Sequence, residues 1–241
     1  MRPRLEYTPG MDNTGIVRRV GSQVKSVKVG DRVLATMLKE GGTGAMADIV
    51  KVPASLVYKI PDNVPLEACA NVGRNYFAAY HSLKTLGKIG QSSLVLVDGA
   101  SGGVGMATIE LAKAMGAKVI AGVSSENKMK FPRQVGADIV LTYGRTKNTF
   151  RLFKTQVQQA CKQLGHPDGV DLVVDMVQGE LFESALVSVT RPLGTICLVG
   201  FTAGQRRESK LVNKFPVMTL PVPTLTFFSI AMEQPYVQVL F

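Results

Sequence analysis

The sequence predicts an α/β fold in which a doubly wound parallel sheet follows a smaller β-rich segment. Between residues 92 and 200, short apolar runs alternate with helical segments, the pattern of parallel strands covered by helices on both faces. Glycine closes most of these helical segments, as is common at helix C-termini. Before residue 61, shorter runs mix β-branched and polar residues between closely spaced Gly and Pro, which favours a barrel-like β-rich piece.

The composition sets wide limits on the kind of protein. A chain of 241 residues, 46% of them hydrophobic, is long enough for one large domain or two modest ones with real cores. No uninterrupted apolar run reaches the roughly 18 residues of a membrane span, and the N-terminus lacks the apolar core of a signal peptide. We therefore expect a cytoplasmic protein with no membrane partner. Three scattered cysteines without a C-x-x-C pair predict reduced thiols, not a zinc site or disulfides.

The first part of the chain predicts short strands and then a helical stretch. The strands are expected at residues 15–21, 28–35 and 47–53. Residues 65–90 have a helical rhythm, with Pro65 suited to the first helical position and Gly87 and Gly90 as stop signals.

The second part predicts five strands and four helices in alternation. The strands are expected at 94–97, 118–123, 139–142, 170–177 and 194–200, and the helices at 106–115, 127–135, 150–164 and 181–189. The tail after Gly204 is apolar but is broken by four prolines. It is either an edge strand or a segment without partners.

A glycine-rich turn links the first apolar strand of this second part to its helix. The residues GASGGVG, from Gly99 to Gly105, follow the strand at 94–97 directly. Glycines there permit a tight bend and a close approach of a pyrophosphate, which the open N–H groups of the helix would bind. This strand–turn–helix context predicts a dinucleotide site. The alternative is a tight strand–helix turn in an α/β protein that binds no nucleotide.

The end of the next strand bears on which dinucleotide is bound. NAD sites usually carry an acid there to bind the ribose 2′-hydroxyl, but here the strand ends in Ser124 and Ser125, with Lys128 close behind. Hydroxyls and an ammonium group would accept a 2′-phosphate, which favours NADPH over NADH. Two observations weigh against this: Lys128 can be a solvated helix residue, and the charge of Glu126 could face the same phosphate.

At this point the residues carry a resemblance to a family. The segments "YTPGMDNTGIVRRVGSQVKSVKVGDRV", "NYFAAYHSL", "DGASGGVGMATIELAKAMGAKVIA" and "GVDLVVDMVQGELFESAL" occur in the family's order, over about residues 7–204. The chain resembles the zinc-independent quinone oxidoreductases (zeta-crystallin-like) among the medium-chain dehydrogenases/reductases. The resemblance implies a partial GroES-like catalytic domain at 1–75 and a Rossmann NADP-binding domain at 76–225, with 226–241 unassigned. Relatives extend further at both ends, so we expect a chain that lacks parts of the catalytic domain.

The resemblance also implies site residues. It places Gly102, Gly103 and Val104 at the pyrophosphate, Ser124, Ser125 and Lys128 at the 2′-phosphate, Tyr143 beside the adenosine, Val177 at the cofactor after the fourth strand, and Gly200, Phe201 and Thr202 along the nicotinamide. Asn75 and Tyr76 fall where relatives have residues near the substrate cleft. His81 matches a cofactor contact only loosely, and a polar residue on a helix face explains it equally well. The resemblance assigns no catalytic acid among the residues present.

Zinc is disfavoured by one substitution. The zinc alcohol dehydrogenases have a His-Glu pair after the glycine that matches Gly10, whereas this chain has Met11 and Asp12. Met is a poor ligand for catalytic zinc, so we expect no metal and no Lewis acid to polarise an alcohol. The resemblance then implies hydride transfer from NADPH to a quinone or a related electron-poor acceptor.

Other functions stay open. The long connection after residue 200 faintly favours a prostaglandin-reductase-like enone reductase. The formal charge of +10 is compatible with a catalytically impaired nucleotide-binding or RNA-binding remnant, although the dispersed Lys and Arg do not favour RNA. The expected partner is a small-molecule electron acceptor, and a homodimer is possible. The sequence does not identify the physiological substrate.

Overall fold

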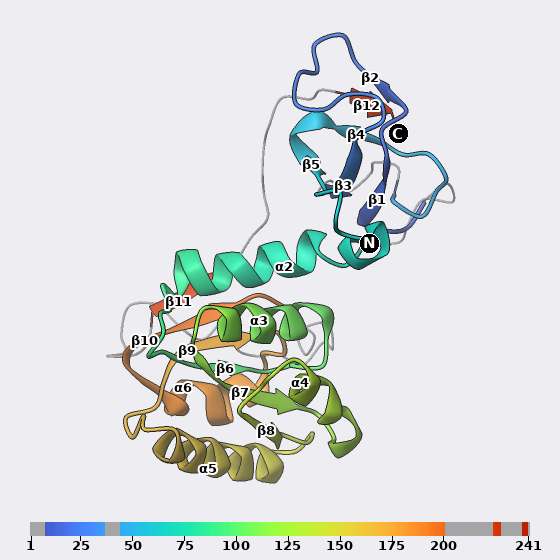
Figure 1. The fold of residues 1–241 in the computed structure, drawn as a ribbon. Coiled ribbons are helices and arrows are strands. Elements are labelled where there is room, and N and C mark those ends of the chain that lie inside the picture. The colour runs from blue at the N-terminus through green and yellow to red at the C-terminus, as the bar shows by residue number, and fades with distance from the viewer. Residues whose placement is uncertain (1–7, 37–43, 201–223, 228–237, 241) are drawn as a thin grey trace. The chain divides into compact units, whose positions relative to one another are not determined.

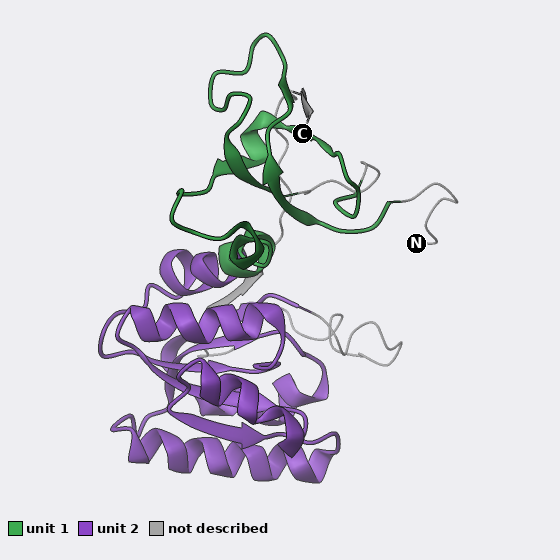
Figure 2. Cartoon of the chain, turned by 45° about the vertical axis from the view of Figure 1, so that its right-hand side comes forward, with its two compact units in different colours: residues 1–77, 229–241 green, residues 78–228 purple. Residues whose placement is uncertain are grey.

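The computed structural model describes residues 8–36, 44–200, 224–227 and 238–240. The chain forms two compact units, one of residues Met1–Phe77 with Ser229–Phe241, and one of residues Ala78–Phe228 (Figure 2). Each unit contains its own β-sheets and its own buried core.

The first unit contains two small sheets. Strands β1 (Asp12–Ile16), β3 (Arg32–Thr36) and β5 (Val57–Lys59) pair antiparallel in the order β1-β3-β5. Strands β2 (Arg19–Val20), β12 (Gln238–Leu240) and β4 (Lys51–Pro53) form the second sheet, with β12 between the others. A short 3₁₀ turn, η1 (Ala54–Leu56), joins β4 to β5. Part of the expected tail therefore pairs with strands from the other end of the sequence.

The strands of this unit are shorter than the sequence predicts. The expected strand at 15–21 is split by the exposed Arg18, and the one at 28–35 begins only at Arg32. A turn precedes Arg32, in which Gly30 has φ +92° and the Lys28 amide donates to Asp31 Oδ2 over 3.0 Å. Because a side chain at φ +92° is strained, the glycine favours the turn over a continuing strand.

The helical stretch after β5 is divided into pieces. It consists of α1 (Leu66–Cys69), α2 (Gly73–Tyr80) and a π-helical segment, η2 (His81–Leu86). The expectation that Pro65 is the first helical residue is wrong: Pro65 is the N-cap of α1, with extended φ −60° and ψ 140°. The predicted stop at Gly87 is confirmed, since Gly87 is the C-cap of η2.

The second unit contains a six-stranded parallel sheet, in the order β11-β10-β9-β6-β7-β8 (Figure 1). Its strands are β6 (Leu94–Val97), β7 (Lys118–Val123), β8 (Ile139–Thr142), β9 (Val170–Asp175), β10 (Thr190–Leu198) and β11 (Thr224–Phe227). From β6 the chain builds outwards to β8 and then returns to build outwards on the other side from β9. The strand order therefore reverses between β6 and β9, which is where ligands bind in doubly wound sheets.

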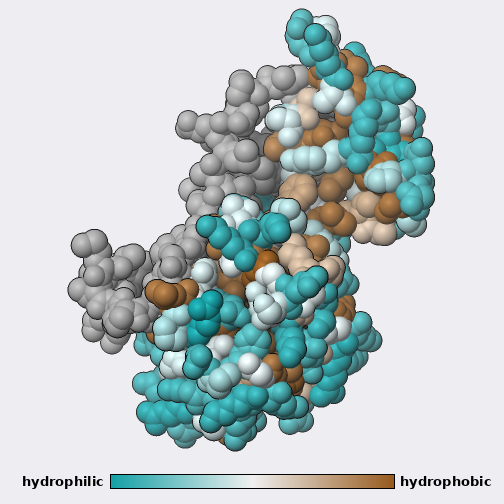
Figure 3. Space-filling model, turned by 60° about the vertical axis from the view of Figure 1, so that its left-hand side comes forward, coloured by the Kyte–Doolittle hydropathy of each residue, from teal (hydrophilic) through white to brown (hydrophobic). Residues whose placement is uncertain are grey.

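Helices cover both faces of this sheet, as predicted for a doubly wound fold. One core layer contains residues of α3 (Gly103–Ala114) and η2, with side chains next to α4 (Lys130–Gln134) packed against it. The opposite layer contains residues of α5 (Lys147–Gln163), η4 (Phe182–Leu186) and α6 (Val187–Val189). Figure 1 shows α3 and α5 on opposite sides of the strands. Figure 3 shows a mostly hydrophilic outer surface on this unit, which fits helices with one buried face.

Several boundaries in the second unit differ from the expectations. The expected strand at 170–177 ends at Asp175, because Asp175 Oδ1 accepts hydrogen bonds from the amides of Val177 and Gln178 and turns the chain. The expected helix at 127–135 is a 3₁₀ turn, η3 (Glu126–Lys128), followed by the short α4. Helix α3 starts at Gly103, three residues before the expected start, so part of the glycine turn is helical.

The three cysteines are free thiols. Cys161 and Cys197 are buried and free, and Cys69 is free and partly buried. Burial raises the pKa of Cys161 to about 11, so this thiol stays neutral. Within the residues that the structure describes, no helix is both long and apolar enough to cross a bilayer.

Candidate dinucleotide-binding site

The glycine turn lies at the carboxyl end of β6, on one side of the strand reversal. Gly99 has φ +54°, and its carbonyl accepts a 2.9 Å hydrogen bond from the Gly102 amide. A Cβ on Gly105 would lie 2.7 Å from both Ala100 Cα and the Gly99 oxygen. Only glycine therefore lets the first turn of α3 pack this closely against the bend.

The start of α3 presents open backbone donors. Its N-cap, Gly102, has no side chain that could accept from the helix amides, and no side-chain cap is present. The first amides of a helix have no partner within it, so those of Gly103, Val104 and Gly105 are available to an anion. The positive end of the helix dipole favours such an anion further. This corner is suited to hold a diphosphate.

A hydroxyl and an ammonium group meet at the end of β7. Lys128 Nζ donates to Ser124 Oγ over 3.3 Å, and Ser125 Oγ donates to Asn127 Oδ1 over 2.6 Å. Lys128 is exposed, so its charge remains open to a ligand. Glu126 is also exposed and lies in the same short turn, η3. Lys128 points its ammonium group at Ser124 and forms no ion pair with Glu126. The pair of Ser124 and Lys128 is a chemical match for a phosphate monoester.

Tyr143 directly follows β8, at the same end of the sheet as Ser124 and Lys128. Its side chain is only 7% exposed, and its ring meets Phe153 edge to face with centroids 5.8 Å apart. Burial raises the pKa of the Tyr143 hydroxyl, and hydrogen bonds with the Ser124 side chain and the Gly99 backbone act in the opposite direction. The phenol is therefore neutral. Its ring is too buried to offer an open face to a ligand.

The loops after β9 and β10 complete the site on the other side of the strand reversal. Val199 and Gly200 both donate backbone hydrogen bonds to the Asp175 carbonyl, over 2.9 and 3.3 Å. A Cβ on Gly200 would lie 2.8 Å from the Met176 oxygen, so the two loops touch through backbone. A Cβ on Gly99 would lie 3.7 Å from Val177 Cγ2. The structure thus brings Val177 to the glycine turn and Gly200 to the loop that carries Val177. Phe201 and Thr202 lie outside the described residues.

Of the remaining predicted residues, Asn75 and Tyr76 belong to the first unit and His81 to the second. Asn75 and Tyr76 lie on α2, within the residues assigned to the first unit, and Asn75 Nδ2 donates to Asn71 Oδ1 over 2.5 Å. His81 is the first residue of η2 and is partly buried. The cofactor residues named above all lie in the second unit, whereas Asn75 and Tyr76 lie in the first.

Met11 and Asp12 have structural partners in the first unit. Both carboxylate oxygens of Asp12 accept from the Arg74 amide at 3.3 Å, which caps the start of α2, and Arg74 Nη1 donates to Met11 Sδ over 3.0 Å. A Cβ on Gly73 would lie only 2.3 Å from Asp12 Oδ1, so glycine admits this capping carboxylate. Among the described residues, no three His, Cys, Asp or Glu side chains gather as metal ligands would.

Two buried acids of the site were not predicted from the sequence. Asp98 follows β6 directly and Asp175 is the last residue of β9, and both are 0% exposed. Asp98 Oδ1 accepts from the Met176 amide over 2.6 Å, and Asp175 holds the amides of Val177 and Gln178. The available signal was an acid directly after a fully apolar strand, in "LVLVD" and again in "DLVVD".

Comparisons with known proteins agree with this geometry. The family model described as "Zinc-binding dehydrogenase" matches residues 103–238, and the one described as "Alcohol dehydrogenase GroES-like domain" matches residues 1–62. The quinone oxidoreductase of Lama guanicoe is 34% identical over 227 residues, which are 93% of this chain and 61% of that protein. The chain spans 52% of the quinone oxidoreductase-like protein 2 homolog of Nematostella vectensis, which is 31% identical over 205 residues. It therefore spans between half and three fifths of these curated relatives.

A solved structure gives the same fold. The mycobacterial protein Rv1454c, solved in complex with NADPH, superposes with a TM-score of 0.73 at 29% identity, over 94% of this chain and 66% of that one. Its similarity spans both units, and the predicted α/β fold is confirmed. The chain belongs to the medium-chain dehydrogenase/reductase family, in its zinc-independent quinone oxidoreductase branch.

Proposed function

We propose that the chain binds NADPH at the corner between β6 and β7 and uses it to reduce a quinone or a related electron-poor acceptor without a metal. The observation that carries this proposal is the combination of two features at one sheet edge. The open amides of α3 follow the glycine turn, in which a Cβ on Gly105 would clash with the backbone. The Ser124–Lys128 pair lies at the end of the next strand. The NADPH complex of the similar mycobacterial protein supports the choice of cofactor.

Each predicted residue takes a role in this proposal. Gly102, Gly103 and Val104 hold the diphosphate, through the open amides of Gly103 and Val104, and Ser124, Ser125 and Lys128 hold the 2′-phosphate, with Tyr143 supporting the adenosine end. Val177 and Gly200, followed along the chain by Phe201 and Thr202, contact the nicotinamide side, while Asn75 and Tyr76 serve the acceptor. When bound, the cofactor supplies the hydride, and the protein contributes orientation and exclusion of water.

The preference for NADPH follows from charge. An ammonium group beside a hydroxyl stabilises a 2′-phosphate dianion and gains nothing from a neutral 2′-hydroxyl. For an exposed cation the gain is about 1 kcal/mol, which corresponds to roughly a 5-fold difference in affinity. Ser124 and Ser125 add hydrogen bonds but no charge, so Lys128 is the main determinant.

A second acceptor class is favoured by one comparison. The enoyl reductase JamJ superposes with a TM-score of 0.71 at 25% identity, over 93% of this chain and 62% of that one. An enone is electron-poor at its β-carbon, as a quinone is at its ring, so the same hydride donor serves both. The chain would then be a prostaglandin-reductase-like enone reductase.

The test is a titration of the full chain with NADPH and NADH, followed by turnover with a panel of quinones and enones. We expect saturable NADPH binding that is tighter than NADH binding, and oxidation of NADPH by one acceptor class. Faster reduction of enones than of quinones would select the second candidate. Tight NADPH binding without turnover of any acceptor would leave a nucleotide-binding module and refute the reductase.

A further inference from the structure

Two acids face each other at the strand reversal of the second unit. Strands β6 and β9 are parallel neighbours, with Val97 opposite Val174, so the following residues, Asp98 and Asp175, are opposite as well. Both side chains are fully buried. The function proposed above assigns neither of them a task.

Each acid uses one carboxyl oxygen and leaves the other unused. Asp98 Oδ1 accepts from the Met176 amide, and Asp175 Oδ1 accepts from the amides of Val177 and Gln178 over 2.9 and 2.7 Å. The Oδ2 atoms of both acids are buried, and neither has a hydrogen-bond partner among the described residues. Two ionised carboxylates would therefore be buried side by side, with repulsion added to the cost of desolvation. One proton between the two oxygens removes both problems, since a protonated carboxyl donates and its neighbour accepts.

We propose that Asp98 and Asp175 share one proton, carried by Asp98, and act as a positioning pair that ties the glycine turn to the loop after β9. In this arrangement Asp98 accepts from the Met176 amide, and Asp175 accepts from the amides of Val177 and Gln178. The pair fixes Val177, which belongs to the proposed cofactor site, at a set place beside the turn. This last consequence rests on the proposed function, whereas the shared proton does not.

The direction of each pKa agrees with this assignment. Burial raises the pKa of both acids, and the charge of Asp175 raises the pKa of Asp98 further. The hydrogen bond from Asp98 acts to lower the pKa of Asp175. The other ionisable groups that interact with the pair are Tyr143, after β8, and Cys197, in β10. Burial raises the pKa of both, so they stay neutral while the pair titrates and supply no counter-charge.

The shared proton gives stability a defined dependence on pH. The folded chain keeps this proton to a higher pH than the unfolded chain does. The free energy of unfolding therefore falls as the pH rises from 3.8, the ordinary value for an aspartic acid, to the raised pKa of Asp98. An asparagine at position 98 would keep the acceptor for Met176, would donate to Asp175 and would not titrate.

The experiment compares the full-length wild-type chain with Asp98→Asn, Asp98→Ala and a control, Asp168→Asn, which removes an exposed carboxylate from the same unit. Infrared spectra at pH 7 should show the carbonyl stretch of a protonated carboxyl group in the wild type and the control, and not in Asp98→Asn. Thermal unfolding should also separate the variants. Asp98→Asn should melt at least as high as the wild type and lose the pH dependence described above, while Asp98→Ala should melt roughly 2–10 °C lower.

Two results would overturn the proposal. One is a wild-type chain without a protonated carboxyl band at pH 7, since a water molecule between two carboxylates would give none. The other is an Asp98→Asn variant that melts as low as Asp98→Ala. NADPH affinity is measured on the same set, and it should fall several-fold in Asp98→Ala and be restored in Asp98→Asn. A wild type that binds no NADPH would refute the proposed function but would leave the infrared and melting results decisive for the pair.

Discussion

The two units of the chain differ in how their strands are stabilised. In the second unit, the central strands are buried on both faces, and every residue of β6 is 0% exposed. In the first unit, the strands are antiparallel and short, and the buried cluster that the described residues form there contains only Val and Ala. A wide sheet with two covered faces stabilises its own strand ends, whereas a narrow one depends on pairing between distant segments such as β12 and β2. The site that the structure defines best accordingly lies on the second unit.

The largest effect is expected from the core of the second unit. Phe153 is fully buried in α5 and contacts the Tyr143 ring. Phe153→Ala should destabilise this unit by about 3–5 kcal/mol, because it leaves a cavity and removes the packing beneath the site. Urea unfolding followed by circular dichroism measures the change.

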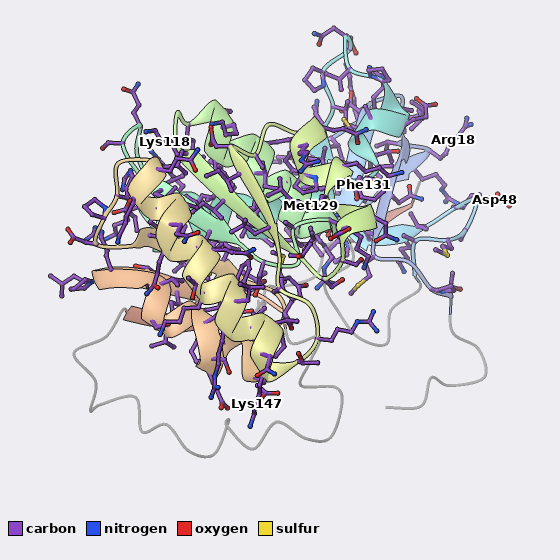
Figure 4. All side chains as sticks on the ribbon, turned by 90° about the horizontal axis from the view of Figure 1, so that it is seen from below. Arg18, Asp48, Lys118, Met129, Phe131 and Lys147 are labelled. Carbon is purple, nitrogen blue, oxygen red and sulfur yellow. The ribbon has the colours of Figure 1, made fainter. Side chains whose placement is uncertain are left out.

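The neighbouring residue gives a matched control. Leu152 is 58% exposed on the same helix, so Leu152→Ala should change stability by no more than about 0.5 kcal/mol. Figure 4 shows this helix between Lys147 at one end and Lys118 near the other, where Lys118 Nζ donates to the Leu164 carbonyl over 2.8 Å. Equal losses from the two variants would contradict the core described above.

A smaller loss of stability, with loss of cofactor binding, is expected at the glycine turn. Gly105→Ala adds a Cβ 2.7 Å from backbone atoms, so the helix and the bend must separate. We expect a cost of about 1–3 kcal/mol and a large fall in NADPH affinity, measured by calorimetric titration. Gly90→Ala is the control, because a Cβ there meets nothing within 4 Å. Unchanged NADPH binding in Gly105→Ala would show that the glycine turn is not part of the NADPH site.

A still smaller effect is expected at Lys128. Lys128→Ala should weaken NADPH binding about 5-fold, a change of ~1 kcal/mol, and leave NADH binding unchanged, because only NADPH carries the 2′-phosphate. Lys162→Ala, an exposed cation at the end of α5, should change neither. A Lys128→Ala variant that keeps the full preference for NADPH would refute the assignment of this lysine.

The smallest effect is expected in the first unit. The hydrogen bond and charge of Lys59, 2.8 Å away, lower the pKa of Asp31, together with the Lys28 amide. A lowered pKa stabilises the folded state above the ordinary value of 3.8, and this contribution is lost as the pH falls through the lowered pKa. Asp31→Asn should therefore lower the free energy of unfolding slightly at pH 7 and leave it unchanged below the lowered pKa, where Asp31 is protonated in the wild type as well. A clear loss of stability at pH 7 would show that this ion pair matters more than its exposure suggests.

The strands of the second unit were easier to predict from the sequence than those of the first. The reason is the same difference in how the strands are stabilised. Strands β6, β7 and β8 have the predicted bounds, because continuous apolar runs between turn residues leave few alternatives. In the first unit, β2 and β4 both pair with β12, which comes from the far end of the chain. No local sequence pattern indicates such a partner.

The site shows the same division between local and long-range signals. The glycine turn and the hydroxyl-ammonium pair were predictable because each lies within a few residues of one strand end. Asp98 and Asp175 were not, because their relation depends on which strands are neighbours in the sheet. The roles of individual residues in binding cofactor and acceptor remain predictions.

The most direct test of the central claim is a calorimetric titration of the purified full chain with NADPH and with NADH under identical conditions. The open amides of α3 and the Ser124–Lys128 pair predict saturable binding of both, with NADPH several-fold tighter. Binding of neither nucleotide, or tighter binding of NADH, would contradict the account.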